Sequence, residues 1–236
     1  MDDSLFGLLR FGPGGWGDEL LLGLRITLLL ALATAPIGLV GGFLLALARR
    51  SDRPVLRFCA TAFTTVFKGL PELITLFIVY YGFSMLLAWF VGLFSDAYVE
   101  VSSFVAGMIA LGAVSASFAS EVFMAALGGI AKGQTEAADA LGISRFTTMR
   151  KVILPQLIRI ALPGLGNLWL VLLKDTALVS VIALPDLLRQ TSIAVGATKE
   201  PFFFFAVAIG IYFVISLASM AVIALLEKRY AKAYAR

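Results

Sequence analysis

The chain has no histidine, one cysteine and few charged residues. Without histidine it lacks the usual general base of enzymes and the commonest metal ligand. Cys59 alone can form neither an intrachain disulfide nor a cysteine-rich metal site. Only 14% of the 236 residues are charged, whereas 60% are apolar, and the mean hydropathy is +0.96. These values exclude a soluble domain and predict an integral membrane protein.

A phosphate-binding loop is also missing. Lys132-Gly133-Gln134 lies near Gly128-Gly129, but the Gly-Lys-Ser/Thr core of such a loop is absent. A serine–lysine nucleophile would need Lys68 or Lys174 beside a serine, and the sequence gives no sign of one. We therefore expect no enzymatic activity, no cofactor, no metal and no nucleic-acid partner. Any energy source has to be another chain.

Long apolar runs predict five membrane-spanning helices, since only helices and closed barrels can cross lipid. The expected fold class is all-α, a polytopic membrane protein with one permease-like domain over residues 1–236. A helix over residues 55–93 would reach ~58 Å, about twice the hydrocarbon core. Lys68-Gly69-Leu70-Pro71-Glu72 therefore predicts a break within it. The expected spans are 20–48, from the break to about 93, 103–127, 162–184 and 201–226.

The third span is rich in small residues. They recur at Ala106, Ala110, Ala113, Ser117 and Ser120. Such spacing predicts close packing against another helix in lipid. Residues 185–200, between the last two spans, predict an amphipathic segment instead.

The basic residues predict the orientation of the spans. Thirteen of the 19 lie in segments 49–57, 132–159 and 228–236. Cytoplasmic loops carry such an excess of lysine and arginine. With five spans, the N-terminus is expected outside and the C-terminus in the cytoplasm.

The polar loop over residues 129–159 predicts a docking surface. Thr135 can cap a helix that begins at Glu136, whose charge suits the positive end of the helix dipole. Ala137, Ala138 and Leu141 then fall on one face. Small side chains allow another protein's backbone to approach closely. The plainer alternative is a loop that only joins two spans.

Stop signals divide this loop into two short helices. Gly142 is a plausible end of the first helix, and Ser144 is a plausible cap of the second. Pro155 is expected to end the second helix.

The loop resembles the EAA signature of bacterial ABC-importer permeases. That signature, EAA-x3-G-x9-I-x-L-P, is matched by Glu136-Ala137-Ala138, Gly142 and Val152-Ile153-Leu154-Pro155, with Val152 in the isoleucine place. The sequence of residues 162–182 is similar to the Q/M permeases for polar amino acids, in particular to Q-type subunits for histidine, basic amino acids and opines.

The resemblance implies a type I importer permease in the bacterial inner membrane, serving a polar, basic amino acid or opine. Its coupling residues would be Glu136, Ala137, Ala138, Leu141 and Gly142. The implied partners are two ATP-binding subunits that hydrolyse the ATP, a second permease chain of a distinct M type, and a periplasmic or lipid-anchored substrate-binding protein. Membrane lipid surrounds the assembly.

Ionisable residues inside apolar runs are candidates for substrate binding, because a charge at the bilayer centre costs at least ~2.5–3.5 kcal/mol. Lys68 and Glu72 stand four residues apart and could neutralise each other. Alternatively, Glu72 could bind a cationic substrate beside the break, where transporters often place their sites. The resemblance favours substrate binding, since Q-type permeases for basic substrates carry an acid after Gly-x-Pro.

Two further groups complete the candidates. Glu121 shares a helix face with Ser117, although Phe118 and Met124 stand where the family has tyrosine and arginine. In the run LKDTALVS, which lines or abuts the pathway in the family, Lys174 and Asp175 could neutralise each other or point to different neighbours. The substrate-binding candidates are Glu72, Ser117, Glu121, Asn167, Lys174, Asp175 and Thr176.

Two rival functions remain. An ATPase-independent secondary transporter or channel would have no use for an alanine-faced docking loop. A structural membrane scaffold would not need five ionisable residues within its apolar runs. Both considerations favour the importer permease.

Overall fold

The computed structural model describes residues 5–93 and 102–233, and these residues form helices joined by turns. A 3-10 turn (Leu5–Leu9) precedes α1 (Gly17–Arg49), α2 (Pro54–Gly69), α3 (Glu72–Gly92) and α4 (Ser103–Gly128). The chain continues through α5 (Gly133–Ala140), α6 (Arg145–Thr148), a π-helical turn (Met149–Ile153) and α7 (Leu154–Asp175). A 3-10 helix (Thr176–Ile182), α8 (Leu187–Thr198) and α9 (Pro201–Ala233) complete it.

Five stretches of the described chain are long and apolar enough to cross a membrane. They are Gly17–Arg49, Glu72–Gly92, Ser103–Gly128, Arg145–Ile182 and Pro201–Tyr230. The all-α class and five spans are therefore confirmed. The break is confirmed as well, since α2 ends at Gly69 and α3 begins at Glu72.

Two details of the loop and the fourth span differ from the expectation. The helix α5 begins at Gly133, so Thr135 lies inside it and does not cap it. Pro155 does not end a helix but is the second residue of α7, directly after the π-helical turn. As a result α6, the π-helical turn and α7 are continuous, and the fourth span begins well before residue 162.

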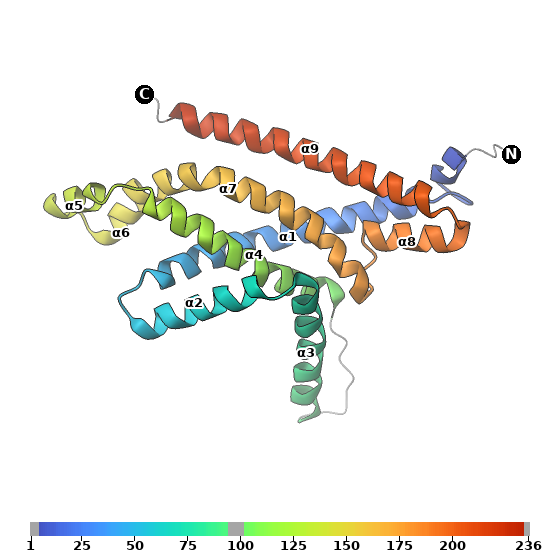
Figure 1. The fold of residues 1–236 in the computed structure, drawn as a ribbon, viewed down its shortest axis with the longest axis horizontal. Coiled ribbons are helices and arrows are strands. Elements are labelled where there is room, and N and C mark those ends of the chain that lie inside the picture. The colour runs from blue at the N-terminus through green and yellow to red at the C-terminus, as the bar shows by residue number, and fades with distance from the viewer. Residues whose placement is uncertain (1–4, 94–101, 234–236) are drawn as a thin grey trace.

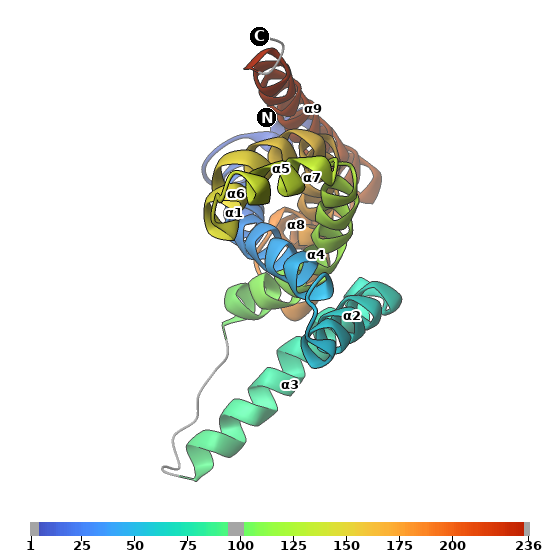
Figure 2. The same ribbon diagram turned by 90° about the vertical axis from the view of Figure 1, so that its left-hand side faces the viewer.

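The long helices lie side by side, with the loop helices at one end (Figure 1). There α1, α4 and α7 follow the long axis, and α9 flanks α7. The helices α5 and α6 lie at one end, while α8 lies at the other, near the start of α1. In both views α3 extends away from the bundle (Figures 1 and 2).

The closest packing in the fold is between α1 and α4. A Cβ atom built on Gly42 would lie 2.5 Å from the Cβ of Ala119 and 2.9 Å from the carbonyl oxygen of Ala116. A Cβ on Gly38, one turn earlier, would lie 2.4 Å from the hydroxyl oxygen of Ser115. Only glycines allow this approach, as in small-residue interfaces of other membrane helices. The predicted small-residue packing of the third span is confirmed, with Ala106, Ala110, Ser117 and Ser120 buried.

The apolar core consists of three clusters along the bundle. The first surrounds Leu30, Leu76 and Val179, where α1, α3, α4 and the 3-10 helix after α7 meet. The second joins α1, α4 and α7 near the loop end, and the third joins α1, α8 and α9 at the other end. Within the described chain, no residue of α2 belongs to any of them. Thus α2 is held by other contacts.

The end opposite the loop is fixed by the start of α8. The Asp186 carboxylate caps α8 by accepting the backbone N–H of Arg189 at 2.9 Å. The Thr27 hydroxyl of α1 accepts the backbone N–H of Leu187 at 3.1 Å. Asp186 is fully buried, and this burial raises the pKa of its carboxyl to about 6, although the N–H groups of the cap and the charge of Arg189 act in the opposite direction.

Adding a methyl group at Gly42 should weaken the α1–α4 contact, because both the carbonyl of Ala116 and the side chain of Ala119 block it. Gly42→Ala is expected to lower the free energy of unfolding by about 1–3 kcal/mol, the usual cost of overpacking. The measurement is denaturant unfolding in detergent micelles. Gly210→Ala in α9, where a Cβ meets nothing within 4 Å, is the matched control and should leave stability unchanged or slightly higher. Equal effects of the two changes would contradict the packing.

The stability of the fold should fall as pH rises through the titration of Asp186. The folded carboxyl has a pKa of about 6, against an ordinary value of 3.8, so the folded state holds the proton more tightly. The stabilisation is complete below about pH 4 and is lost by about pH 6, with a change of at most about 3 kcal/mol. Asp186→Asn should keep the helix cap and flatten this slope, as measured by melting temperature between pH 4 and 7. The exposed Glu200→Gln should leave the slope as it is, and a slope that survives in Asp186→Asn would contradict the assignment.

Candidate functional site

The polar loop forms an exposed tip at one end of the molecule (Figure 1). Gly142 ends α5 with a φ of +67°, a conformation that favours glycine, and the Ser144 hydroxyl accepts the backbone N–H of Thr147 to cap α6. Both expectations about these residues are confirmed. The side chains of Leu141 and Phe146 are 77% and 75% exposed. Two large apolar side chains so exposed on a polar loop indicate an interaction surface.

The face of α5 that points outward differs in part from the expected alanine face. Glu136, Ala137, Leu141 and Gly142 are exposed, but Ala138 is only 4% exposed and faces the rest of the chain. In the turn after α5, the N–H of Ile143 donates to the carbonyl of Ala138 at 2.9 Å. We define the coupling surface as Glu136, Ala137, Leu141 and Phe146.

Inside the bundle, Glu121 of α4 binds two cations. Its carboxylate accepts a hydrogen bond from the Arg49 guanidinium at 3.0 Å and another from the Lys68 ammonium. The same guanidinium donates to the hydroxyl of Ser120 at 3.2 Å. We call Arg49, Lys68 and Glu121 the Glu121 cluster. It joins the last residue of α1, the end of α2 and the later half of α4.

This cluster decides whether Lys68 pairs with Glu72. The lysine pairs with Glu121, and the described structure contains no ion pair between Lys68 and Glu72. Mutual neutralisation across the break is therefore wrong for this structure. Instead, Glu72 lies close enough to Asp175 for the two carboxyl groups to act on each other by charge.

The two carboxyl groups come from separate helices, beside the apolar cluster around Leu30. Glu72 opens α3 directly after the break, and Asp175 is the last residue of α7. Leu73, next to Glu72, packs in the same apolar cluster as Leu30 and Ala35, which lie near the middle of the 33-residue α1. Two carboxyl groups this close share a proton or need a cation between them. This pair is the candidate substrate site.

The other candidates divide between exposed and buried positions. Asn167 and Lys174 are exposed on one face of α7, seven residues apart. Ser117 and Thr176 are fully buried, and their hydroxyls donate to the carbonyls of Ala113 and Leu173, at 3.0 and 2.7 Å. Lys174 is exposed and its neighbour Asp175 is half-buried, and the charge of the lysine acts on the Asp175 carboxyl.

Arg49 belongs to the Glu121 cluster, and the sequence did not predict this role. In the sequence Arg49 is one of several basic residues of a loop. The arginine that the family carries three residues after the glutamate is replaced here by Met124. The signal was available in the topology, because spans one and three cross the membrane in the same direction. Their parallel packing, with Gly38 against Ser115 and Gly42 against Ala119, brings the end of α1 beside the later half of α4.

Comparisons with known proteins agree with this arrangement. The family model for the binding-protein-dependent transport system inner membrane component matches residues 38–232. The chain belongs to this family. It is 39% identical over 223 residues to the octopine transport system permease protein OccQ of Rhizobium meliloti, with 94% of each chain covered. It is 35% identical over 216 residues to the histidine/lysine/arginine/ornithine transport system permease protein HisQ of Salmonella typhimurium, covering 92% of this permease and 95% of that one.

Solved structures support the same fold for this permease. A chain in the crystal structure of an amino acid ABC transporter with histidines matches with a TM-score of 0.80 and 31% identity, over 97% of this chain and 100% of that one. A chain of the MetNI methionine ABC transporter, in an inward-facing conformation, matches with a TM-score of 0.63 and 19% identity. The relatives are permease subunits and not enzymes. The recognised family, the fold and the expectation of no enzymatic activity are therefore confirmed.

The Glu121 cluster should be measurable as an energetic coupling between α2 and α4. Glu121→Gln leaves two cations without their carboxylate, and adding Lys68→Met removes one of them. Because the Glu121 side chain is 41% exposed, we expect a coupling energy on the order of 1 kcal/mol in a double-mutant cycle of unfolding.

The control cycle combines Lys68→Met with Glu72→Gln, for which we expect additive effects within about 0.5 kcal/mol. A larger coupling of Lys68 to Glu72 than to Glu121 would contradict the described pairing and restore the neutralised pair across the break.

Proposed function

We propose that the chain is the permease subunit of an ATP-driven importer for a basic amino acid or opine. The single observation that carries the proposal is full-length similarity to permeases of octopine and of histidine, lysine, arginine and ornithine transport systems. Two features of this chain agree with it. They are the exposed coupling surface and the pair of carboxyl groups at Glu72 and Asp175.

The coupling surface is the proposed contact with an ATPase. ATP is hydrolysed by two partner subunits, and the permease itself carries no cofactor. Leu141 and Phe146 supply the apolar contact, while Glu136 and Ala137 border it. Ala138 and Gly142, which the family signature also includes, hold the shape of the loop: one packs inward and the other makes the turn. Movement of the ATPase subunits then reaches the membrane through α7, because α6 continues into it.

The remaining partners follow from the proposed orientation. The coupling surface and the basic segments 49–57 and 132–159 face the cytoplasm, as do Lys228 and Arg229; Arg236 lies outside the described residues. The N-terminus and α8 face outward, where a periplasmic or lipid-anchored binding protein delivers the substrate. Similarity to Q-type relatives favours a distinct M-type chain as the second permease.

Glu72 and Asp175 are the proposed contacts for the charged end of the substrate. A guanidinium or ammonium group between them would accept no proton from the pair but would donate hydrogen bonds to both carboxylates and offset one of their two charges. Asn167 and Lys174 lie on the exposed face of α7 and are proposed to meet the substrate or the partner permease. Glu121, Ser117 and Thr176 are proposed to support the substrate site without touching the substrate, because their polar groups already bind other residues.

A charge in the coupling surface should uncouple transport from ATP hydrolysis. Leu141→Asp places a carboxylate in the proposed apolar contact and is expected to abolish ATP-driven uptake in membrane vesicles, while the amount of permease in the membrane is unchanged. Val55→Asp is the matched control, because Val55 is also an apolar side chain on the proposed cytoplasmic side and is 73% exposed. Full uptake by Leu141→Asp would refute the docking role.

Removing one carboxylate should select against cationic substrates. Glu72→Gln is expected to lower arginine uptake at least ten-fold, since breaking a buried charge pair costs ~3–5 kcal/mol, whereas glutamine uptake should change little. Uptake of both amino acids is measured in vesicles at equal permease content. The exposed Glu200→Gln, outside the pair, should change neither. Equal loss of arginine and glutamine uptake in Glu72→Gln would contradict substrate recognition by Glu72.

A further inference from the structure

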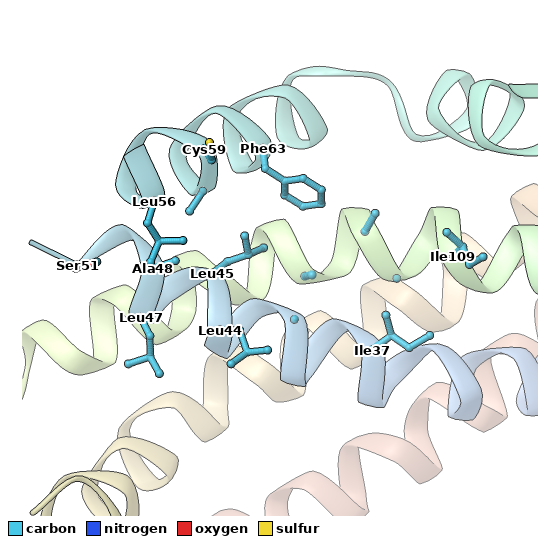
Figure 3. Close-up of a pocket in the computed structure, with 15 residues that line it drawn as sticks. Ile37, Leu44, Leu45, Leu47, Ala48, Ser51, Leu56, Cys59, Phe63 and Ile109 are labelled. Atoms are coloured by element: carbon cyan, nitrogen blue, oxygen red, sulfur yellow. The ribbon is translucent and has the colours of Figure 1, made fainter. Parts of the chain in front are cut away.

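A large apolar groove lies between α1, α2 and α4, and neither Glu72 nor Asp175 lines it (Figure 3). Its volume is about 970 Å³. Ile37 and Leu44 of α1, Leu56 and Phe63 of α2, and Ile109 of α4 point into it or along its edges. The groove exists because its floor consists of small residues, Gly41, Ala48, Gly112, Ala113 and Ala116, while α2 takes no part in the three apolar clusters of the described chain.

The groove is about as long as one leaflet of a bilayer. Its lining runs along α1 from Ile37 to Ala48, eleven residues or ~17 Å at the rise of a helix. Half of the hydrocarbon core is ~15 Å. One end is closed by the turn between α1 and α2, where Ser51 lines the groove. The turn therefore lies at the height of the lipid headgroups when the groove lies in the hydrocarbon.

Two arginines stand at this closed end. The backbone N–H of Arg53 donates to the Ser51 hydroxyl at 3.2 Å, which places Arg53 beside the groove. Arg57 follows one helical turn later, and its N–H donates to the carbonyl of Arg53 at 3.1 Å. Both side chains are exposed, and neither forms an ion pair in the part of the chain that the structure describes. The exposed Asp52 between them offsets one of the two charges at most.

We propose that this groove binds one acyl chain of an anionic phospholipid, whose phosphate is held by Arg53 and Arg57. Apolar walls of one leaflet's length fit the acyl chain, since an unfilled groove would forfeit its dispersion contacts. The paired guanidinium groups fit the phosphate, which they can bind through two parallel hydrogen bonds each. The bound lipid fills the space under α2 and holds this helix beside α1, next to the Glu121 cluster. The site is separate from the coupling surface and from the substrate site, and it does not depend on the proposed transport function.

The test uses the complete transporter in vesicles that contain a trace of phospholipid with a photoreactive diazirine in its acyl chain. After illumination, mass spectrometry maps the adducts to residues 37–48 and 56–63. We expect more adducts with phosphatidylglycerol than with phosphatidylcholine, by roughly five-fold per arginine. Arg53→Gln with Arg57→Gln should remove this preference.

The matched control is Lys228→Gln with Arg229→Gln, which removes two exposed charges near the end of α9 and should keep the preference. Equal labelling by both lipids in the unchanged protein would show that bulk lipid fills the groove, and would overturn the proposal. Labelling by neither lipid would show that a protein segment, such as the second permease, covers the groove, and would overturn it as well.

Discussion

The contact between α1 and α4 is the constraint on which the other features depend. Gly38 and Gly42 bring the two helices so close that a single added methyl group at Gly42 would overlap the opposite backbone. Because the helices run in parallel, this contact also sets their register. It carries Arg49, at the end of α1, to the level of Glu121 on α4. Neighbouring small residues of the same two helices, Gly41, Gly112 and Ala116, form the floor of the groove below α2.

The Glu121 cluster extends this constraint to the pair of carboxyl groups at Glu72 and Asp175. Lys68, which Glu121 binds, lies four residues before Glu72 and just before the break. Holding the end of α2 fixes where the chain turns into α3, and so where Glu72 meets Asp175. Charged residues within the bilayer are costly unless paired, and the cluster pairs Lys68 and Glu121 with each other and Glu121 with Arg49. Glu72 and Asp175 take no part in this cluster, and of the two the charge of Lys174 acts on Asp175.

The sequence predicted the helices and the break well, because apolar length, glycine and proline act locally. It also predicted the turn at Gly142 and the cap at Ser144, both of which depend on neighbouring residues only. Pairing partners were harder, since Lys68 lies four residues from Glu72 but binds a residue 53 positions away. The inward side of Ala138 and the position of Pro155 inside α7 were missed for a similar reason. Both depend on how the loop folds back on the bundle, which periodicity alone does not encode.

Uptake by the reconstituted transporter, with and without its ATPase subunits, tests the central claim most directly. Proteoliposomes would carry the two permease chains, with or without the ATPase subunits. The substrate-binding protein and radiolabelled arginine would be supplied outside. The account predicts accumulation against a gradient only when the ATPase subunits and internal ATP are both present. Uptake of similar rate without them would contradict it and would indicate a secondary transporter or channel.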